Sequence, residues 1–173
     1  MVIVNEYLNF KTEIGKVMLM GKPLEVIFWS IALPGFGQLL NGKVVKGIVF
    51  IALEFIINVQ SRFNGIILLS FLGETELALS QTNFQWLMFY PCVYFYAMWD
   101  AYRDAGGVRN PFAFFPFVFA AYFVTVGLMY SSKVMLFGKL LGPVWLPMLF
   151  TVPGVIIGFL LLKIATKMNE HKK

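Results

Sequence analysis

Residues 30–48, S-I-A-L-P-G-F-G-Q-L-L-N-G-K-V-V-K-G-I, decide the fold of this chain. They lie between two apolar runs, 24–33 and 48–57, and include five residues that break helices or allow close backbone approach: Pro34, Gly35, Gly37, Gly42 and Gly47. The same stretch also holds four polar residues, Gln38, Asn41, Lys43 and Lys46. The pattern predicts a tight helical hairpin inside a membrane.

Composition excludes an ordinary soluble domain. Hydrophobic residues make up 59% of the 173 residues and charged residues only 13%, against roughly 45–50% and 25% in soluble proteins. Because a bilayer offers the backbone no water, lipid-embedded chains of this kind fold as helices. The sequence therefore predicts an all-α integral membrane protein with a single membrane domain over 1–173.

The amino-terminal segment 1–23 has apolar residues at helical spacing opposite charged ones, which predicts an amphipathic interfacial helix. A signal peptide is the competing interpretation, but its apolar core would be only 26–29. The hairpin follows over 24–59, and an extracytoplasmic loop is expected over 60–83. Transmembrane helices are expected over 84–99, 111–130 and 144–162, before a basic cytoplasmic tail over 163–173.

The basic residues distinguish two topologies, because Lys and Arg concentrate in cytoplasmic loops. If 24–40 crosses the membrane as a fifth short helix, the 14 basic residues divide six against eight between the two sides. If 24–40 is re-entrant, they divide three against eleven. The clearer bias favours about four transmembrane helices, with 24–40 re-entrant, both termini cytoplasmic and 60–83 outside, while a fifth crossing stays open.

Two motifs stand out: P-G-F-G-Q-L-L-N-G at 34–42 within the hairpin, with Lys46-Gly47 behind it, and W-D-A-Y-R-D-A at 99–105, at the end of the predicted span 84–99. Together they resemble the small bacterial polytopic membrane proteins related to the TM2 domain, a family mostly of unknown function. The resemblance covers about residues 24–106. It implies a location in the bacterial cytoplasmic membrane and brings no activity, ligand or cofactor.

We interpret the motif residues as structural. The glycines would let the hairpin backbone pack against a neighbouring helix, and Gln38 and Asn41 would satisfy carbonyl groups that the hinge leaves free. A salt bridge from Asp100 or Asp104 to Lys43 or Lys46 would join the two motifs at the cytoplasmic face. The structural motif comprises Pro34, Gly35, Gly37, Gln38, Asn41, Gly42, Lys46, Gly47, Trp99, Asp100 and Arg103.

Glu54 is the candidate functional residue, because a carboxyl group within a span costs about 2.5–3.5 kcal/mol on insertion scales. Its expected partners are Asn58, Gln60 or a basic residue brought in by the neighbours of the 24–40 segment. One interpretation is a neutral carboxyl group hydrogen-bonded between helices. The other is a role in coupling protons or ions.

No catalytic, cofactor-binding or metal site is expected, because the single histidine, His171, lies in the tail and the single cysteine, Cys92, lies in an apolar run. The basic loops are expected to bind anionic headgroups rather than nucleic acid. Aromatic residues crowd 112–123 beyond what four spans can bury, which favours contact with lipid, with another membrane protein or with a second copy of the chain. The sequence therefore predicts a non-enzymatic interaction, assembly or accessory subunit. The alternatives are a small oligomeric transporter, channel or lipid scramblase using Glu54, and a lipid-active enzyme.

Overall fold

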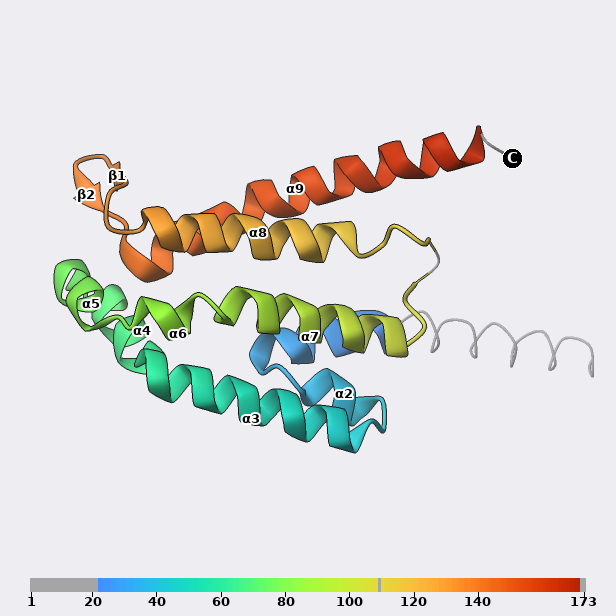
Figure 1. Ribbon diagram of the computed structural model, residues 1–173, viewed down its shortest axis with the longest axis horizontal. Helices are drawn as coiled ribbons and strands as arrows, with labels where there is room; N and C mark the ends of the chain where they lie inside the picture. The colour runs from blue at the N-terminus through green and yellow to red at the C-terminus, as the bar shows by residue number, and fades with distance from the viewer. Residues whose placement is uncertain (1–21, 109, 172–173) are drawn as a thin grey trace, which may run out of the picture.

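The computed structural model describes residues 22–108 and 110–171, and helices make up 77% of it (Figure 1). Residues 22–32 are helical. The helices that follow are α2 (Phe36–Leu40), α3 (Val44–Ser61), α4 (Phe63–Phe71), α5 (Thr75–Gln81), α6 (Phe84–Leu87), α7 (Tyr90–Asp104), α8 (Phe115–Tyr130) and α9 (Gly142–Glu170). Two short strands, β1 (Met135–Leu136) and β2 (Lys139–Leu140), precede α9.

Helices α3, α7, α8 and α9 run roughly along the long axis of the molecule and alternate in direction (Figure 1). One end of the molecule, which we name the hinge end, holds the turn between α2 and α3, the end of α7 and the end of α9. The opposite end, which we name the hairpin end, holds α4, α5 and the β1–β2 hairpin. The fold is thus an elongated helical bundle with two distinct ends.

Residues 22–40 run into this bundle and return to the same end (Figure 1). The helix over 22–32 runs antiparallel to α7, and at its far end the backbone oxygen of Ile31 accepts a hydrogen bond of 2.8 Å from the Tyr94 hydroxyl. The chain then turns, and α2 leads back: a Cβ added at Gly37 would lie 2.9 Å from the Val26 oxygen and 2.7 Å from the Ala101 Cβ. Residues 22–40 therefore form a helical hairpin that enters and leaves the bundle at the same end.

The α8–α9 pair packs backbone against backbone. A Cβ added at Gly158 would lie 2.5 Å from the Pro116 Cα atom, and one added at Gly154 would lie 2.8 Å from the Phe119 oxygen. Small residues permit this close approach, which is how helices gain contact area in lipid. The glycines of α9 therefore position the carboxy-terminal helix on α8.

Residues 60–83, treated as a loop from the sequence, carry the short helices α4 and α5. Ile66 of α4 and Ala78 of α5 are buried together with Val144 of α9. The apolar residues of this segment thus cover the beginning of α9.

The β1–β2 hairpin departs from the expected all-α structure. Met135 pairs with Leu140 and Leu136 with Lys139, so Phe137 and Gly138 form the two-residue turn. Both have positive φ angles, 51° and 77°, as the favoured two-residue hairpin turns require. The fold is therefore mostly helical with one small two-stranded sheet.

Two helices, α3 and α9, are long and apolar enough to cross a membrane. α8 is apolar but has only 16 residues. The predicted helix 84–99 is split into α6 and α7, because Pro91 has no N–H to donate to the carbonyl of Leu87. The four predicted spans therefore stay a prediction.

The structure describes only part of each predicted terminal segment, 1–23 and 163–173. The amphipathic helix expected over 1–23 lies outside the described residues, except for positions 22 and 23, which are helical. At the other end, α9 continues as a helix to Glu170. Most of the predicted tail, 163–173, is thus an extension of the last helix.

Candidate functional site

The hinge between residues 22–32 and α3 is built on close backbone contact. Pro34 is buried after the first helical segment, and Gly35 follows with a φ angle of +106°. A Cβ added at Gly35 would lie 2.5 Å from the Gly47 oxygen, and one added at Gly47 would lie 3.0 Å from the Gly35 oxygen. Gly35 and Gly47 therefore let the hinge lie directly on α3, as the sequence predicts for these glycines.

Gly42 has a different role from the one predicted. A Cβ added there would have no neighbour within 4 Å, so Gly42 does not mediate helix packing. Its φ angle of +73° instead turns the chain between α2 and α3, a conformation that glycine adopts without steric cost. This turn brings Lys46 toward α7.

Gln38 and Asn41 fasten α2 to α7. The Gln38 side-chain amide donates to the Ala97 oxygen at 2.8 Å, and the Asn41 amide donates to the Ala101 oxygen at 2.8 Å. The prediction that these amides satisfy carbonyl groups of the hinge itself is wrong, because both reach the backbone of a helix about 60 residues away in sequence. A carbonyl oxygen has two lone pairs, so a helical carbonyl can accept this second bond.

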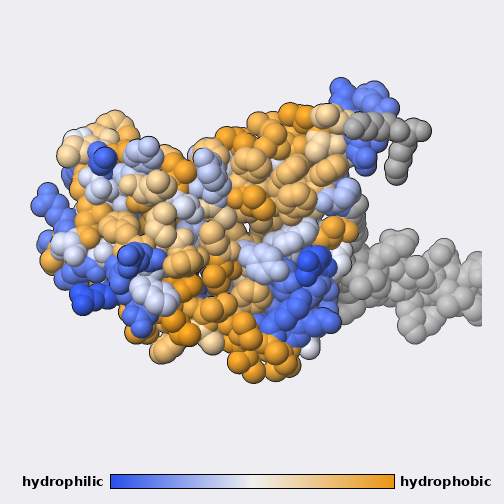
Figure 2. Space-filling view, in the orientation of Figure 1, coloured by the Kyte–Doolittle hydropathy of each residue, from blue (hydrophilic) through white to orange (hydrophobic). Residues whose placement is uncertain are grey.

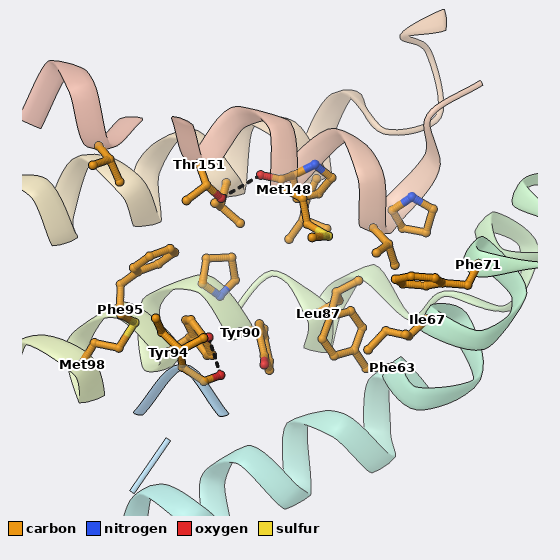
Figure 3. A pocket seen from close by; sticks show the side chains of 18 residues that line it. Phe63, Ile67, Phe71, Leu87, Tyr90, Tyr94, Phe95, Met98, Met148 and Thr151 are labelled. Atoms are coloured by element: carbon orange, nitrogen blue, oxygen red, sulfur yellow. Dashed lines mark hydrogen bonds between the residues drawn. The ribbon is translucent and has the colours of Figure 1, made fainter. Parts of the chain in front are cut away.

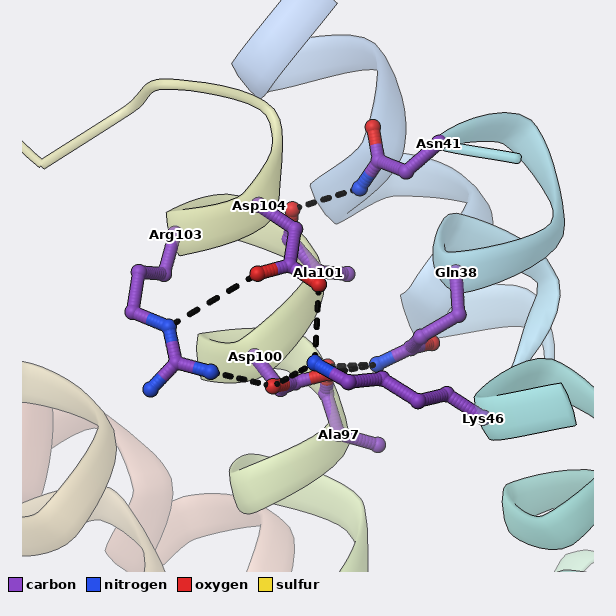
Figure 4. A network of polar contacts seen from close by, with 8 residues as sticks. All are labelled: Gln38, Asn41, Lys46, Ala97, Asp100, Ala101, Arg103 and Asp104. Atoms are coloured by element: carbon purple, nitrogen blue, oxygen red, sulfur yellow. Dashed lines mark hydrogen bonds and ion pairs between the residues drawn. The ribbon is translucent and has the colours of Figure 1, made fainter. Parts of the chain in front are cut away.

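A cluster of ion pairs lies beside these amides (Figure 4). Lys46 Nζ lies 2.8 Å from Asp100 Oδ1 and 2.8 Å from Asp104 Oδ2. Arg103 donates to Asp100 Oδ1 at 2.6 Å, one turn along α7, and Gln38 donates to Asp100 Oδ2 at 3.3 Å. The predicted salt bridge between the motifs is confirmed, with Lys46 rather than Lys43 as its cation.

Burial makes Asp100 the centre of the cluster. Its side chain is 3% exposed, whereas those of Lys46 and Arg103 are 43% and 46% exposed. A buried carboxylate that loses its partners is strongly destabilising. The partners of Asp100 therefore hold the hinge, the start of α3 and the end of α7 in one arrangement.

Helix dipoles explain why these charges pair across helices. Lys46 lies in the first turn of α3, where the helix dipole disfavours a cation, and Asp104 ends α7, where it disfavours an anion. Because the start of α3 and the end of α7 meet at the hinge end, each charge compensates the other. The pairing thus removes two unfavourable local interactions at once.

Trp99 belongs to the motif but does not contact the hinge cluster. Its ring packs on Phe114 and Phe117, with centroid distances of 6.3 and 5.7 Å, and on Tyr102 of its own helix. Trp99 therefore joins α7 to α8. Within the predicted aromatic cluster 112–123, the aromatic side chains of 112–119 are partly buried against one another and against α7, whereas Tyr122 is exposed.

Glu54 lies on α3 about halfway between the two ends and is 7% exposed. The Tyr90 hydroxyl lies near its carboxyl group, while its Oε2 atom has no hydrogen-bond partner among the described residues. The predicted partner Asn58 instead bonds Asn64 of α4 at 3.1 Å. Sequence reasoning missed Tyr90, although Tyr90 and Tyr94 stand one helical turn apart in the predicted span 84–99.

Replacing a single lysine tests the ion-pair cluster. We expect Lys46→Met to lower the free energy of unfolding by about 1–3 kcal/mol, because Asp100 stays buried with fewer partners. Lys43→Met is the matched control: Lys43 is exposed and forms no ion pair with the described residues, so we expect a change within about 0.5 kcal/mol. Denaturation of both variants by sodium dodecyl sulfate in mixed micelles measures the difference, and equal losses would contradict this role for Lys46.

Comparison with known proteins finds no relative of this chain. No family model, no curated protein and no solved structure matches the chain. The resemblance to the TM2 domain family therefore stays a prediction that rests on the two motifs.

Proposed function

We propose that the chain is a multi-pass protein of the cell membrane, with four spans formed by α3, α6–α7, α8 and α9. The most hydrophilic residues gather toward the two ends of the molecule, which supports this proposal (Figure 2). Among the charged residues that the structure describes, Glu54 alone lies between the two ends of the bundle, and the sides of α3 and α9 expose large apolar side chains. Water would disfavour such a surface, whereas lipid tails would not.

The described basic residues support an orientation. Six of them lie toward the hinge end: Lys22, Lys43, Lys46, Arg103, Lys163 and Lys167. Three lie toward the hairpin end: Arg62, Lys133 and Lys139. Because positive residues concentrate on the cytoplasmic side, the hinge end and both termini are assigned to the cytoplasm, where the lysines face anionic headgroups.

Within the membrane we propose a non-enzymatic role in assembly, through a groove of about 420 Å³ between α7 and α8. The observation that carries this proposal is a pair of exposed tyrosines. Tyr96 and Tyr122 line the groove and are 56% and 62% exposed, and neither hydroxyl forms a hydrogen bond with the described part of the chain. Tyrosine favours the edges of a bilayer, so two unpaired hydroxyls inside the apolar belt call for a polar partner.

A second copy of this chain is the occupant that the groove fits. A tyrosine hydroxyl both donates and accepts hydrogen bonds, so two copies facing each other through the same groove satisfy their hydroxyls mutually. Such a self-complementary contact has two-fold symmetry, which is the commonest arrangement of homo-oligomers. The exposed side chains in the middle of α3 and α9 are apolar and offer these hydroxyls no partner.

The natural cysteine tests this contact, because Cys92 is exposed and lines the groove. We expect a short bis-maleimide to link two copies through Cys92 in bilayers. Removing the hydroxyls with the double substitution Tyr96→Phe and Tyr122→Phe should reduce linking, at about 0.6 kcal/mol per lost interhelical hydrogen bond. In a Cys92→Ala background, a cysteine at Ile156 on the outer face of α9 is the control and should not link. Linking at Ile156 equal to that at Cys92 would contradict the assigned face.

A transporter, channel or scramblase using Glu54 is the second candidate. The observation that favours it is the buried carboxyl oxygen without a partner among the described residues. Intramembrane ionisable residues often mark ion or substrate pathways. A neutral carboxyl group that packs against Tyr90 accounts for the same geometry and agrees with the assembly role.

Glutamine at position 54 distinguishes the two candidates, because it keeps the shape and hydrogen bonding of the side chain but cannot ionise. We expect Glu54→Gln to match the wild type in expression, in any phenotype that gene deletion reveals, and in stability within about 1 kcal/mol. Glu54→Leu, which removes the polar atoms as well, reports whether Tyr90 needs a partner. A stable Glu54→Gln protein that behaves like the deletion would rank transport above assembly.

A further inference from the structure

A second cavity, of about 600 Å³, separates the two halves of the molecule (Figure 3). Leu87, Tyr94 and Met98 line it from α6 and α7, and Met148 and Thr151 line it from α9. Its volume is within the range of about 300–1,000 Å³ that is typical of ligand sites. This cavity lies apart from the ion-pair cluster and from the groove between α7 and α8, so neither of those sites explains its presence.

Two of the three polar side chains in the lining already form hydrogen bonds, and the third lies near a carboxyl group. The Tyr94 hydroxyl donates to the Ile31 oxygen at 2.8 Å, and the Thr151 hydroxyl donates to the Pro147 oxygen at 3.1 Å. The Tyr90 hydroxyl lies near the Glu54 carboxyl group. None of the lining residues is charged. A polar or charged ligand would therefore lose its hydration without gaining partners, so the cavity selects an apolar occupant.

The cavity is also elongated along the helices. Its lining extends from Leu87 to Met98 on α6–α7 and from Pro143 to Val155 on α9. At 1.5 Å per residue these stretches measure about 16 and 18 Å. The long axis is thus parallel to the helices, which is also the direction of lipid chains around a membrane-spanning bundle.

We propose that this cavity binds one acyl chain of a phospholipid, held between α4 and α7 on one side and α8 and α9 on the other. The charged headgroup remains outside, because the lining offers it no partner. The inference rests on the proposed membrane location but not on the groove between α7 and α8. An acyl chain bound here would contact both halves of the bundle and would stabilise their packing against each other.

Photolabelling tests the site. The protein is reconstituted with phosphatidylglycerol that carries a diazirine in the middle of one chain, illuminated, and digested for mass spectrometry. We expect adducts on buried residues of the cavity lining, such as Met98 of α7 and Leu128 of α8, and also on the outer face of α9, where Val152 is 59% exposed. Adducts on the outer face alone would overturn the acyl-chain site while keeping the membrane location. An absence of adducts from both faces would overturn the site and the membrane location together.

Two identical substitutions, one turn apart, supply the matched control. Val155→Trp fills the cavity, whereas Val152→Trp adds the same side chain to the outer face. We expect labelling of Met98 and Leu128 to be lost in Val155→Trp and kept in Val152→Trp, with outer labelling unchanged in both. Undiminished cavity labelling in a folded Val155→Trp protein would overturn the proposal.

If Val155→Trp fails to fold, an experiment on the wild-type protein still tests the site. Unlabelled phospholipid added to delipidated wild-type protein should raise its melting temperature and compete with the cavity adducts. Cavity labelling that resists this competition would count against a defined site. A diazirine fatty acid that labels the cavity when the phospholipid does not would overturn the assignment to a phospholipid chain.

Discussion

The side chain of Asp100 is 3% exposed, and a buried carboxylate must be paired if the protein is to remain stable. Its partners come from three parts of the chain: Gln38 of α2, Lys46 of α3 and Arg103 of α7. Because the partners come from α2, α3 and α7, their hydrogen bonds and ion pairs with the single Asp100 carboxylate fix the positions of these three helices relative to one another. The hinge residues matter chiefly because they allow this arrangement: Gly35 and Gly47 remove the side chains that would separate α2 from α3.

The cluster at the hinge end also affects the middle of the molecule. Holding α2 on α7 keeps residues 22–32 alongside the same helix, so the backbone of Ile31 meets the Tyr94 hydroxyl. Ile31 and Tyr94 both line the large cavity. If the cluster opened, residues 22–40 would lose their attachment to α7, and the cavity would lose part of its lining. Architecture and the proposed lipid site therefore depend on the same carboxylate.

The sequence was most informative where chemistry is strongly constrained. Helix-breaking residues at 34–47 predicted the hinge, and unpaired charges at 46 and 100–104 predicted the salt bridge, because buried or interfacial charges need partners. Contacts decided by three-dimensional packing could not be predicted in this way. Gln38 and Asn41 bond α7 rather than their own hinge, and Glu54 faces Tyr90 rather than Asn58. The short helices within 60–83 and the β1–β2 turn at Phe137 also escaped detection, since brief elements leave weak periodic signals.

We propose that residues 22–40 enter and leave the membrane on one side, held there by the Asp100 cluster. Labelling with an impermeant maleimide in intact cells distinguishes this topology from a crossing, with single cysteines at Lys22, Lys43 and Gln81 of a Cys92→Ala protein; all three positions are exposed. We expect labelling at position 81 in intact cells, and labelling at 22 and 43 only after the cells are permeabilised. Labelling at 22 but not at 43 in intact cells would show that the segment crosses the membrane and would contradict the proposed topology.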